Sequence, residues 1–204
     1  MAENESAAHL HLFQVPWGWM GVAATAMGLA ATTLPCEAPA QAARNLLRSL
    51  RRGRRQRGDA PLAAILAERG QLALALPTAQ PLDLAPGVRQ GLIARFVEQA
   101  QWYFAGSHVA FDLPVDLRGL SDFQRRALLA AKEVPYGRTA SYSDIARRMG
   151  HPRAFRAVGN AMARNPTPLV VPCHRIIAAD GSLGGFGGNL PLKRRLLELE
   201  GALR

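Results

Sequence analysis

Cysteine is nearly absent from this sequence, because Cys36 and Cys173 are the only two in 204 residues. Two cysteines are too few for a disulfide-stabilised scaffold. One disulfide is formally possible, but a reducing cytosol is the simpler interpretation, and a cytoplasmic location is therefore predicted. Internal repeats and long low-complexity segments are absent as well. With 49% hydrophobic residues, the composition predicts one or two compact domains with a hydrophobic core rather than a disordered tail.

Charge is missing from residues 6–36, which contain no Asp, Glu, Lys or Arg. A run of this kind occurs in signal peptides and membrane helices. However, Glu3 and Glu5 precede it where a signal peptide carries basic residues, and a proline and several glycines interrupt it. We therefore interpret residues 17–35 as two short strands that turn near Gly28 and pack in a core, and we expect no membrane segment.

Acidic residues are outnumbered, since 25 Lys and Arg face 15 Asp and Glu and the net charge is +10. Residues 111–204 hold 15 basic and 8 acidic residues, and residues 1–110 hold 10 and 7, so the second half is the more basic. Nearly all the basic residues are arginines, which bind phosphate through two N–H groups at once. The balance favours a nucleic-acid partner for the second half. An Arg-rich protein without such a partner is the alternative.

The first half is predicted to be a mixed α/β domain. Residues 38–57 begin as a helix and then become strongly basic, with seven arginines between Arg44 and Arg57. Such a run can contact phosphates, but a solvated helix end or loop is the interpretation that we favour. A short helix over residues 62–70 and a strand over residues 71–77 are expected to follow.

A long amphipathic helix over residues 88–106 is expected to close this domain. Residues 107–119, extended and interrupted by proline, are interpreted as a linker to the second half. Apolar side chains recur in the helix at three- and four-residue steps and share one face. They are Leu92, Ile93, Phe96, Val97, Ala100, Tyr103 and Phe104.

The second half is predicted to be mostly helical. A capping box of Ser121 and Gln124 opens one helix, and a second cap of Ser141 and Asp144 opens another. A third helix is expected over residues 153–165, where a proline follows. The last two helices are short and are joined by a tight turn that contains glycine. This is the outline of a helix-turn-helix, a DNA-binding motif.

The third helix carries "AVGNAMA", which offers few long polar side chains for reading base edges in the major groove. Small residues instead let a helix lie close to a narrow groove, which indicates minor-groove binding with little sequence specificity. Arg156, near the start of this helix, is long enough to reach the base stack. A buried helix contact with one exposed arginine is the alternative.

Cys173 is either a nucleophile or a small buried apolar residue. A buried strand is predicted to end at Pro172, followed by a turn with Cys173 and His174 and by a second short strand. A reactive thiol needs a base or a positive neighbour. Adjacent residues of a strand point to opposite faces, so contact with His174 requires a turn or a bridging water. Glu198 and Glu200, on the predicted C-terminal helix, are candidates to orient the histidine.

Four stretches occur in order and at close spacing: "FQRRALLAAKEVPYGRTASYSDIARRMG", "RAVGNAMARNP", "VVPCHRI" and "GSLGGFGGNLPLKRRLLELEG". Together they resemble the O6-alkylguanine-DNA alkyltransferases, from about residue 111 to residue 201. Residues 1–110 resemble the N-terminal domain of that family only loosely. The resemblance implies an α+β fold. An N-terminal α/β, RNase H-like domain would span residues 1–110, and a helical C-terminal domain with a winged helix-turn-helix motif would span residues 111–204.

The resemblance also implies roles in catalysis. Cys173 would accept the alkyl group. His174 would act as the base through a water molecule, and Glu200 would hold the histidine. Asn165 would brace the turn that carries the nucleophile. Tyr142 would hydrogen-bond N3 of the guanine and help the base to leave.

Two further sets of residues are implied by the resemblance. Arg156 would enter the base stack and replace the flipped nucleotide, and main-chain carbonyls near Cys173 and Ile176 would bind the guanine amino group. The residues expected to contact DNA are Arg156, Tyr142, Ala157, Gly159, Asn160 and Ala161. Those expected to line the substrate pocket are Met162, Ile176, Phe186, Gly187 and Gly188.

The implied reaction is an irreversible, single-turnover transfer of an alkyl group from O6 of a flipped-out guanine to Cys173. The partner would be double-stranded DNA, bound through the minor groove. No cofactor, membrane or obligatory protein partner is implied. A non-enzymatic DNA-lesion binding protein of the same fold is the alternative, but such relatives typically carry tryptophan in place of the cysteine.

Two features depart from the family or leave a choice open. The family's substrate loop usually has a serine where this chain has Gly187 and a glycine where it has Asn189, which bears on rate and on the preferred alkyl group. Some relatives bind a structural zinc in the N-terminal domain. We expect no metal here, because the candidate ligands follow no strong pattern. They are His9, His11, Cys36 and His108.

Overall fold

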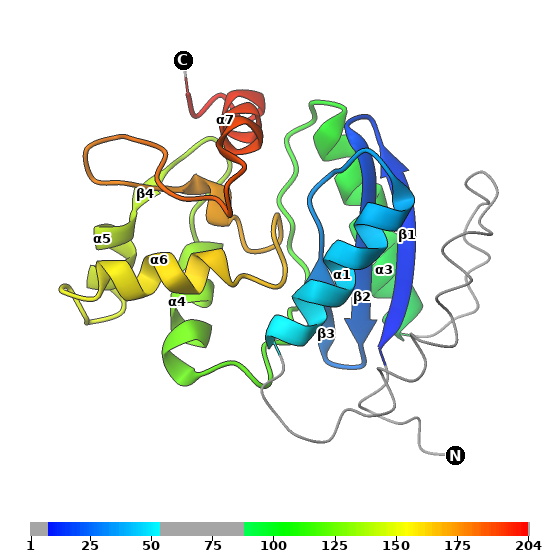
Figure 1. Ribbon diagram of the computed structural model, residues 1–204, viewed down its shortest axis with the longest axis horizontal. Helices are drawn as coiled ribbons and strands as arrows, with labels where there is room; N and C mark the ends of the chain where they lie inside the picture. The colour runs from blue at the N-terminus through cyan, green and yellow to red at the C-terminus, as the bar shows by residue number, and fades with distance from the viewer. Residues whose placement is uncertain (1–7, 54–87, 204) are drawn as a thin grey trace.

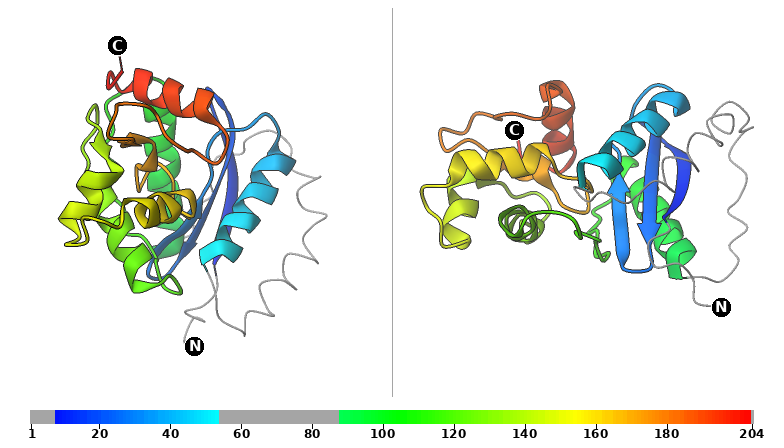
Figure 2. Two further views of the ribbon diagram at one scale, coloured as in Figure 1. Left: turned by 60° about the vertical axis from the view of Figure 1, so that its left-hand side comes forward. Right: turned by 60° about the horizontal axis from the view of Figure 1, so that its bottom comes forward.

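The computed structural model describes residues 8–53 and 88–203, which form two units in contact (Figure 1). The first contains an antiparallel sheet of β1 (His9–Val15), β2 (Gly18–Thr25) and β3 (Gly28–Thr32), in that order. Helix α1 (Pro39–Gly53) covers one face and helix α3 (Val88–Phe104) the other (Figures 1 and 2). The expected helix over residues 62–70 and strand over residues 71–77 lie outside the described residues.

The two strands predicted in residues 17–35 are confirmed as β2 and β3, with Gly28 as the first residue of β3. Gly28 has φ of +146°, and a Cβ there would lie 2.8 Å from the backbone of Pro114, so glycine is required. Strand β1 was not predicted, although polar and apolar residues alternate from His9 to Leu12. Ala23 of β2 packs toward α1, whereas Val22 and Ala24 pack toward α3.

Helix α3 confirms the predicted amphipathic face, since all seven residues predicted on that face are buried. The segment after it is not a free linker. Val109, Phe111 and Leu113 are buried in the core beneath the sheet. The amide of Leu29 donates to the carbonyl of Pro114 at 2.8 Å, which extends the sheet beyond β3. The proline-interrupted sequence predicted the extended backbone, but not that it would pair with a distant strand.

The second unit is mostly helical, as predicted. Its helices are α4 (Asp122–Lys132), α5 (Tyr142–Arg148), α6 (Phe155–Ala163) and α7 (Leu190–Leu199). A short 3₁₀ helix, η2 (Cys173–Arg175), precedes β5 (Ile176–Ile177), which pairs in parallel with β4 (Ala140–Ser141). These elements surround a second core of buried apolar side chains.

The two predicted helix caps are present, with one difference. Ser141 and Asp144 form a complete capping box. Ser121 accepts a hydrogen bond from the Gln124 amide, as expected, at 3.2 Å. The Gln124 side chain, however, does not bond back to Ser121 but donates to the carbonyl of Arg164 at 3.4 Å. Helix α4 is thereby connected to the end of α6.

The prediction of a strand that ends at Pro172 is wrong. The backbone forms a tight turn there, in which the amide of Val171 donates to the carbonyl of Thr167 at 2.9 Å. Leu169 is buried with φ of +74°, which is uncommon for a residue with a side chain. Side-chain hydrogen bonds from Asn165 hold this turn closed, so an apolar run that is typical of a strand adopts a different backbone.

The two units share buried side chains. Leu169, Val170 and Leu196 of the second unit pack in the core of the first. The amide of Thr32 in β3 donates to the carbonyl of Pro166 at 2.9 Å, and its hydroxyl donates to the carbonyl of Pro168 at 2.7 Å. The two units are therefore fixed to one another at the segment that leaves α6.

Within residues 8–53 and 88–203, no helix has both the length and the apolar character that crossing a bilayer requires.

Candidate active site around Cys173

Cys173 lies at the start of η2, beneath the C-terminal end of α6. Its side chain is buried in the second core with Met162 and Ile176, two of the residues predicted to line the substrate pocket. The 3₁₀ turn removes the difficulty that neighbouring residues of a strand point to opposite faces, because Cys173 and His174 lie on a helical turn. Both cysteines of the chain are free thiols.

His174 is held by Glu200, so the choice between Glu198 and Glu200 is settled by the geometry. His174 Nε2 lies 2.8 Å from Glu200 Oε1, and both side chains are almost fully buried. Glu198 is exposed on the same helix. His174 Nδ1 is also buried and has no hydrogen-bond partner among the described residues.

Glu200 accepts hydrogen bonds from three further residues that the sequence did not indicate, and one of them is the amide of Gly137 at 3.4 Å. Arg175 donates from Nε to Oε2 at 2.8 Å and from its terminal nitrogen to Oε1 at 2.9 Å. Tyr103, on α3 of the first unit, donates its hydroxyl to Oε1 at 2.7 Å. Tyr103 was predicted only as an apolar core residue. Because it is far from Glu200 in the sequence, no local pattern indicated a contact between the two residues. The carboxylate thus connects the two units directly beside His174.

The ionisation states follow from burial and from these contacts. Burial raises the pKa of Glu200, but hydrogen bonds from His174 and Arg175 outweigh it and lower the pKa from 4.5 to about 2. Because Glu200 is ionised at neutral pH, it accepts from Nε2, and Nδ1 of His174 carries the lone pair. Burial lowers the pKa of His174 despite this carboxylate. The imidazole is therefore neutral and able to accept a proton.

Cys173 is a thiol at neutral pH. Burial raises the pKa of Cys173, while Asn165 and the charge of Lys193 act in the opposite direction. A buried thiol has to lose its proton before the sulfur can attack, and a neutral imidazole has the chemistry to accept one.

Lys193 on α7 is a third residue that the sequence analysis missed. Its ammonium group is fully buried and donates to the carbonyls of Ile176 and Leu183. It lies 5.9 Å from the ring centre of Tyr142 and 5.8 Å from that of Phe186. Burial lowers its pKa from 10.5 to about 8. One signal was available, because Lys193 is one of only two lysines in a chain rich in arginine.

Asn165 lies across the turn that carries Cys173. Its Nδ2 donates to the carbonyl of Val171 at 2.8 Å, and its Oδ1 accepts from the amide of Thr167 at 3.0 Å. Both bonds close the turn between α6 and η2. The geometry thus agrees with the bracing position that the sequence resemblance implied for this residue.

Tyr142 lies under the glycine-rich loop that follows β5. Its hydroxyl donates to the carbonyl of Gly185 at 3.3 Å. A Cβ at Gly184, where φ is +66°, would lie 2.9 Å from the tyrosine ring. Burial raises the pKa of Tyr142, so the hydroxyl keeps its proton and remains a donor. The loop backbone therefore lies directly on this ring.

The rest of the predicted pocket is divided between core and surface. Phe186 is half-buried and packs against both cores, whereas Gly187 and Gly188 are exposed. A Cβ at Gly187 would have no neighbour within 4 Å, so the loop is open at this position. Asn189 accepts from the amide of Leu192 at 3.1 Å and caps α7, which gives this departure from the family a structural reason.

Main-chain carbonyls near Cys173 and Ile176 were predicted to bind the guanine amino group, and the carbonyls of these two residues already have donors. The carbonyl of Cys173 accepts from the amide of Ile176, and that of Ile176 accepts from Lys193.

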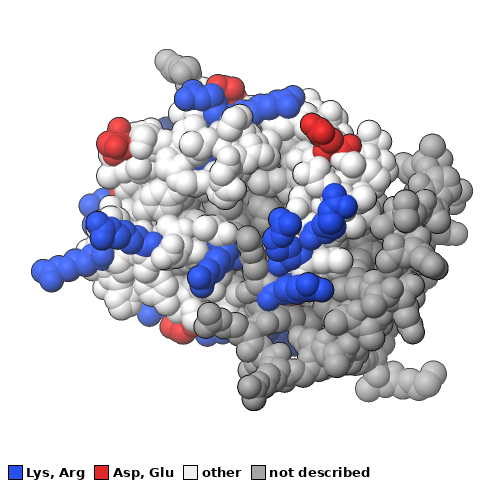
Figure 3. Space-filling model, in the orientation of Figure 1, with Lys and Arg blue, Asp and Glu red and all other residues white. Residues whose placement is uncertain are grey.

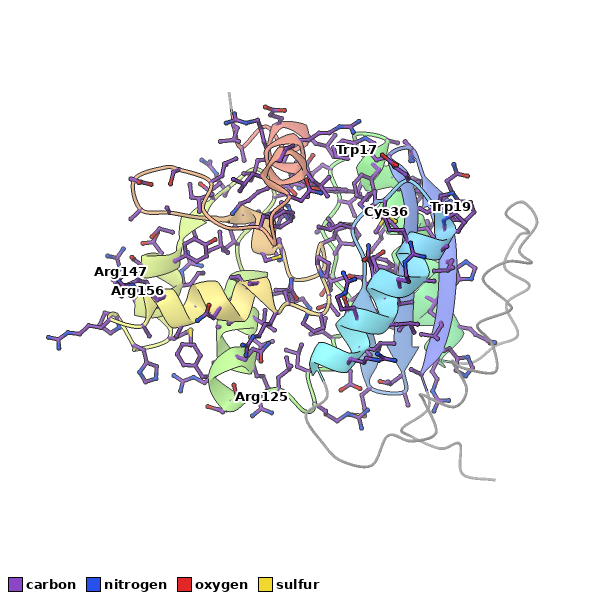
Figure 4. The ribbon with its side chains drawn as sticks, in the orientation of Figure 1. Trp17, Trp19, Cys36, Arg125, Arg147 and Arg156 are labelled. Carbon is purple, nitrogen blue, oxygen red and sulfur yellow. The ribbon has the colours of Figure 1, made fainter. Side chains whose placement is uncertain are left out.

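Helix α6 presents most of the predicted DNA contacts to solvent. Arg156, Ala157 and Asn160 are exposed, and Gly159 is half-buried near the Tyr142 ring. Ala161 is buried in the second core, so its predicted DNA contact is corrected to a core position. Figure 4 shows Arg156 together with Arg147 at the outer end of this unit.

In the described part of the chain, no three His, Cys, Asp or Glu side chains are grouped as a metal site would require. The thiol of Cys36 donates to the carbonyl of Trp19 at 3.3 Å, beside α1 (Figure 4).

Comparisons with known proteins give a consistent result. The family described as "6-O-methylguanine DNA methyltransferase, DNA binding domain" matches residues 122–202. The methylated-DNA–protein-cysteine methyltransferase of Mycolicibacterium paratuberculosis is 54% identical over 104 residues, which cover 51% of this chain and 62% of that protein. The protein of the same name from Mycobacterium tuberculosis is 50% identical over 110 residues, covering 54% and 66%. These matches span a little under two thirds of the curated relatives.

Solved structures match over a greater length. The Mycobacterium tuberculosis O6-methylguanine methyltransferase is 32% identical with a TM-score of 0.63, covering 96% of this chain and 94% of that one. The Mycobacterium tuberculosis OGT in complex with DNA has the same identity and TM-score, with 95% and 93% covered. The O6-methylguanine-DNA methyltransferase of Pyrococcus kodakaraensis shares the fold at 24% identity and a TM-score of 0.56, covering 96% and 99%.

Proposed function

Because the chain belongs to the 6-O-methylguanine DNA methyltransferase family, we propose that it repairs DNA by transferring an alkyl group from O6 of guanine to Cys173. The observation that carries this proposal is the buried series of Cys173, neutral His174 and ionised Glu200. It combines a nucleophile, a base with an unpaired nitrogen, and a carboxylate that fixes the tautomer of that base. A buried cysteine in a purely structural role has no need of the last two.

The reaction is a single displacement. His174 Nδ1 accepts the thiol proton through one water molecule. The sulfur attacks the alkyl carbon, the S–C bond forms as the C–O6 bond breaks, and guanine leaves with the electron pair of that bond. A hydrogen bond from the Tyr142 hydroxyl to N3 stabilises the charge that develops on the base. That hydroxyl has to exchange its bond with Gly185 for one with the substrate.

The product is a thioether at Cys173, and neither His174 nor Glu200 is a nucleophile placed to remove the alkyl group. Each protein molecule therefore acts once. No cofactor takes part in this displacement. The absence of a side chain at the open position of Gly187 favours acceptance of alkyl groups larger than methyl.

The partner is double-stranded DNA, approached through the minor groove. Phe155, Arg156 and Asn160 are exposed on α6, and its other exposed side chains are small, which suits close contact without sequence readout. A guanine inside a duplex is out of reach of a buried thiol, so the nucleotide has to be flipped out, with Arg156 taking its place.

We also propose identities for the two halves of the chain. Residues 1–110 would form an RNase H-like unit, and residues 111–204 would form the DNA-binding unit. The protein would be cytoplasmic and would act without a protein partner.

The proposal is tested by the mass of the intact protein after mixing with a duplex that contains one O6-methylguanine. We expect a gain of one methyl group, which peptide mapping assigns to Cys173. Cys36→Ala serves as the control that should still be methylated, because Cys36 contacts Trp19 of β2 in the first unit, whereas Cys173 lies in the core of the second. Cys173→Ala should gain nothing. Tight binding to the lesion with no change in mass would instead support a lesion-binding protein.

Gly184→Ala is expected to slow alkyl transfer by about tenfold or more, because the new Cβ would push the loop off the Tyr142 ring. Gly181→Ala is the matched control. Gly181 also has positive φ, at +84°, but a Cβ there would meet nothing within 4 Å. Each substitution costs about 1–2 kcal/mol of backbone strain. Equal transfer rates in the two variants would show that the contact with Tyr142 has no role.

A further inference from the structure

Helix α1 is amphipathic, and its exposed side is formed by arginine. Ala42, Leu46 and Leu50 are buried against the sheet. Arg44 and Arg48 are exposed on the opposite side, and so is Arg51. Steps of four and three residues place the three guanidinium groups on one side of the helix, over about 10 Å along its axis. These three residues form the α1 arginine face.

The α1 arginine face is not neutralised by the residues that the structure describes. Within residues 8–53 and 88–203, no carboxylate forms an ion pair with Arg44, Arg48 or Arg51, and the one contact is from Arg48 to the Asn45 side chain at 3.4 Å. Arg125 on α4 and Arg147 on α5, by contrast, are paired with aspartates on their own helices. Three adjacent positive charges repel one another, and a polyanion relieves this repulsion.

The α1 arginine face lies on the same side of the molecule as α6. In Figure 3, Lys and Arg side chains gather over α1 and over α6, and the described residues show no Asp or Glu side chain between the two helices. The hydrogen bonds from Thr32 to Pro166 and Pro168 fix β3, on which α1 packs, to the segment that leaves α6. The two basic surfaces therefore keep a fixed relation to one another.

We propose that the α1 arginine face is a second DNA-binding surface, which extends the interface of α6 onto the N-terminal unit and contacts backbone phosphates of the same duplex. The inference rests on the proposed function, because it takes the duplex on α6 as its starting point. Guanidinium groups bind phosphate oxygens in pairs and carry no sequence information when they do so. Such a surface suits a repair protein that has to bind any sequence. It also gives a function to the part of the arginine run that lies on α1.

The test is the salt dependence of DNA binding, measured for Arg44→Gln, Arg48→Gln, Arg51→Gln and the triple variant. The logarithm of the binding constant falls with the logarithm of salt concentration by about 0.9 for each phosphate neutralised. We expect each single variant to reduce that slope by about 0.9 and the triple variant by about 2.7. The reduction should be the same for undamaged DNA and for DNA with O6-methylguanine, because phosphate contacts do not depend on the base.

Arg95→Gln is the matched control, since Arg95 is exposed on α3, which covers the opposite face of the sheet. It removes one charge and should leave the slope unchanged. Equal urea midpoints for all variants establish that each is folded. If the triple variant keeps the wild-type slope, or loses no more than Arg95→Gln, the second surface is overturned while the proposed function stands. If the wild type neither binds the duplex nor gains a methyl group, both proposals fail together.

Discussion

Replacing Glu200 with glutamine is expected to lower the free energy of unfolding by about 3–5 kcal/mol, the range for breaking a buried ion pair by removing one partner. The substitution leaves the buried guanidinium of Arg175 without its carboxylate. It also weakens the acceptor for His174 Nε2 and for the Tyr103 hydroxyl, so alkyl transfer should slow as well. Urea denaturation at neutral pH measures the first effect, and the rate of methyl gain by intact mass measures the second.

Glu198→Gln is the matched control. Glu198 lies two residues earlier on the same helix and is exposed, so its change should alter stability by no more than about 0.5 kcal/mol. Both variants remove one negative charge, and a difference between them therefore reports burial and hydrogen bonding rather than net charge. Similar unfolding energies for the two variants would contradict a structural role for the Glu200 carboxylate.

The pH dependence of stability provides a second measurement of the same carboxylate. The folded pKa of Glu200, about 2, lies below its ordinary value of 4.5. The stabilisation is therefore complete above pH 4.5 and is lost as the pH falls from 4.5 toward 2. His174 acts in the same direction from a higher pH, because its lowered pKa makes the folded state lose stability below 6.5. Glu200→Gln should flatten the lower part of this acid limb.

The sequence predicted those parts of the fold whose causes are local. The apolar spacing of α3, the Ser141 cap and the glycine at the start of β3 each depend on residues within a few positions of one another. The prediction of a strand before Cys173 was wrong, because Asn165 closes the backbone into a turn there. The apolar residues of this run do not indicate that hydrogen bond. The segment after α3 gave no sign that it would pair beside Leu29, which is distant in sequence.

In the candidate site, too, the residues with a local sequence signal were predicted, and those that depend on distant contacts were not. Cys173 and His174 were predicted as site residues because they are adjacent in the sequence. The role of Glu200 was predicted from the family resemblance. Tyr103, Arg175 and Lys193 were missed. Their importance depends on contacts across the fold, and for Tyr103 on a contact between the two units. A tyrosine at an apolar position of an amphipathic helix looks like a core residue, and only the structure shows where its hydroxyl lies.

His174→Gln is expected to slow alkyl transfer at neutral pH by about 10²- to 10⁴-fold, the usual contribution of a general base. Glutamine can still donate to Glu200 but accepts no proton from the thiol. The wild-type rate should be level at neutral pH and fall below pH 6.5, where His174 becomes protonated, at a pH set by its lowered pKa. The variant should behave differently. Burial raises the pKa of Cys173, so its rate should keep rising with pH above neutrality as the thiol ionises unaided.

The change in the shape of the pH profile separates a base from a residue that only supports the turn. A purely structural loss lowers the rate equally at every pH and leaves the profile unchanged. His9→Gln, an exposed change on β1, controls for the removal of an imidazole and should match the wild type. If His174→Gln keeps both the rate and the profile of the wild type, Cys173 ionises without this base. The buried ammonium of Lys193 would then be the group that stabilises the thiolate, because among the described residues its positive charge lowers the pKa of Cys173.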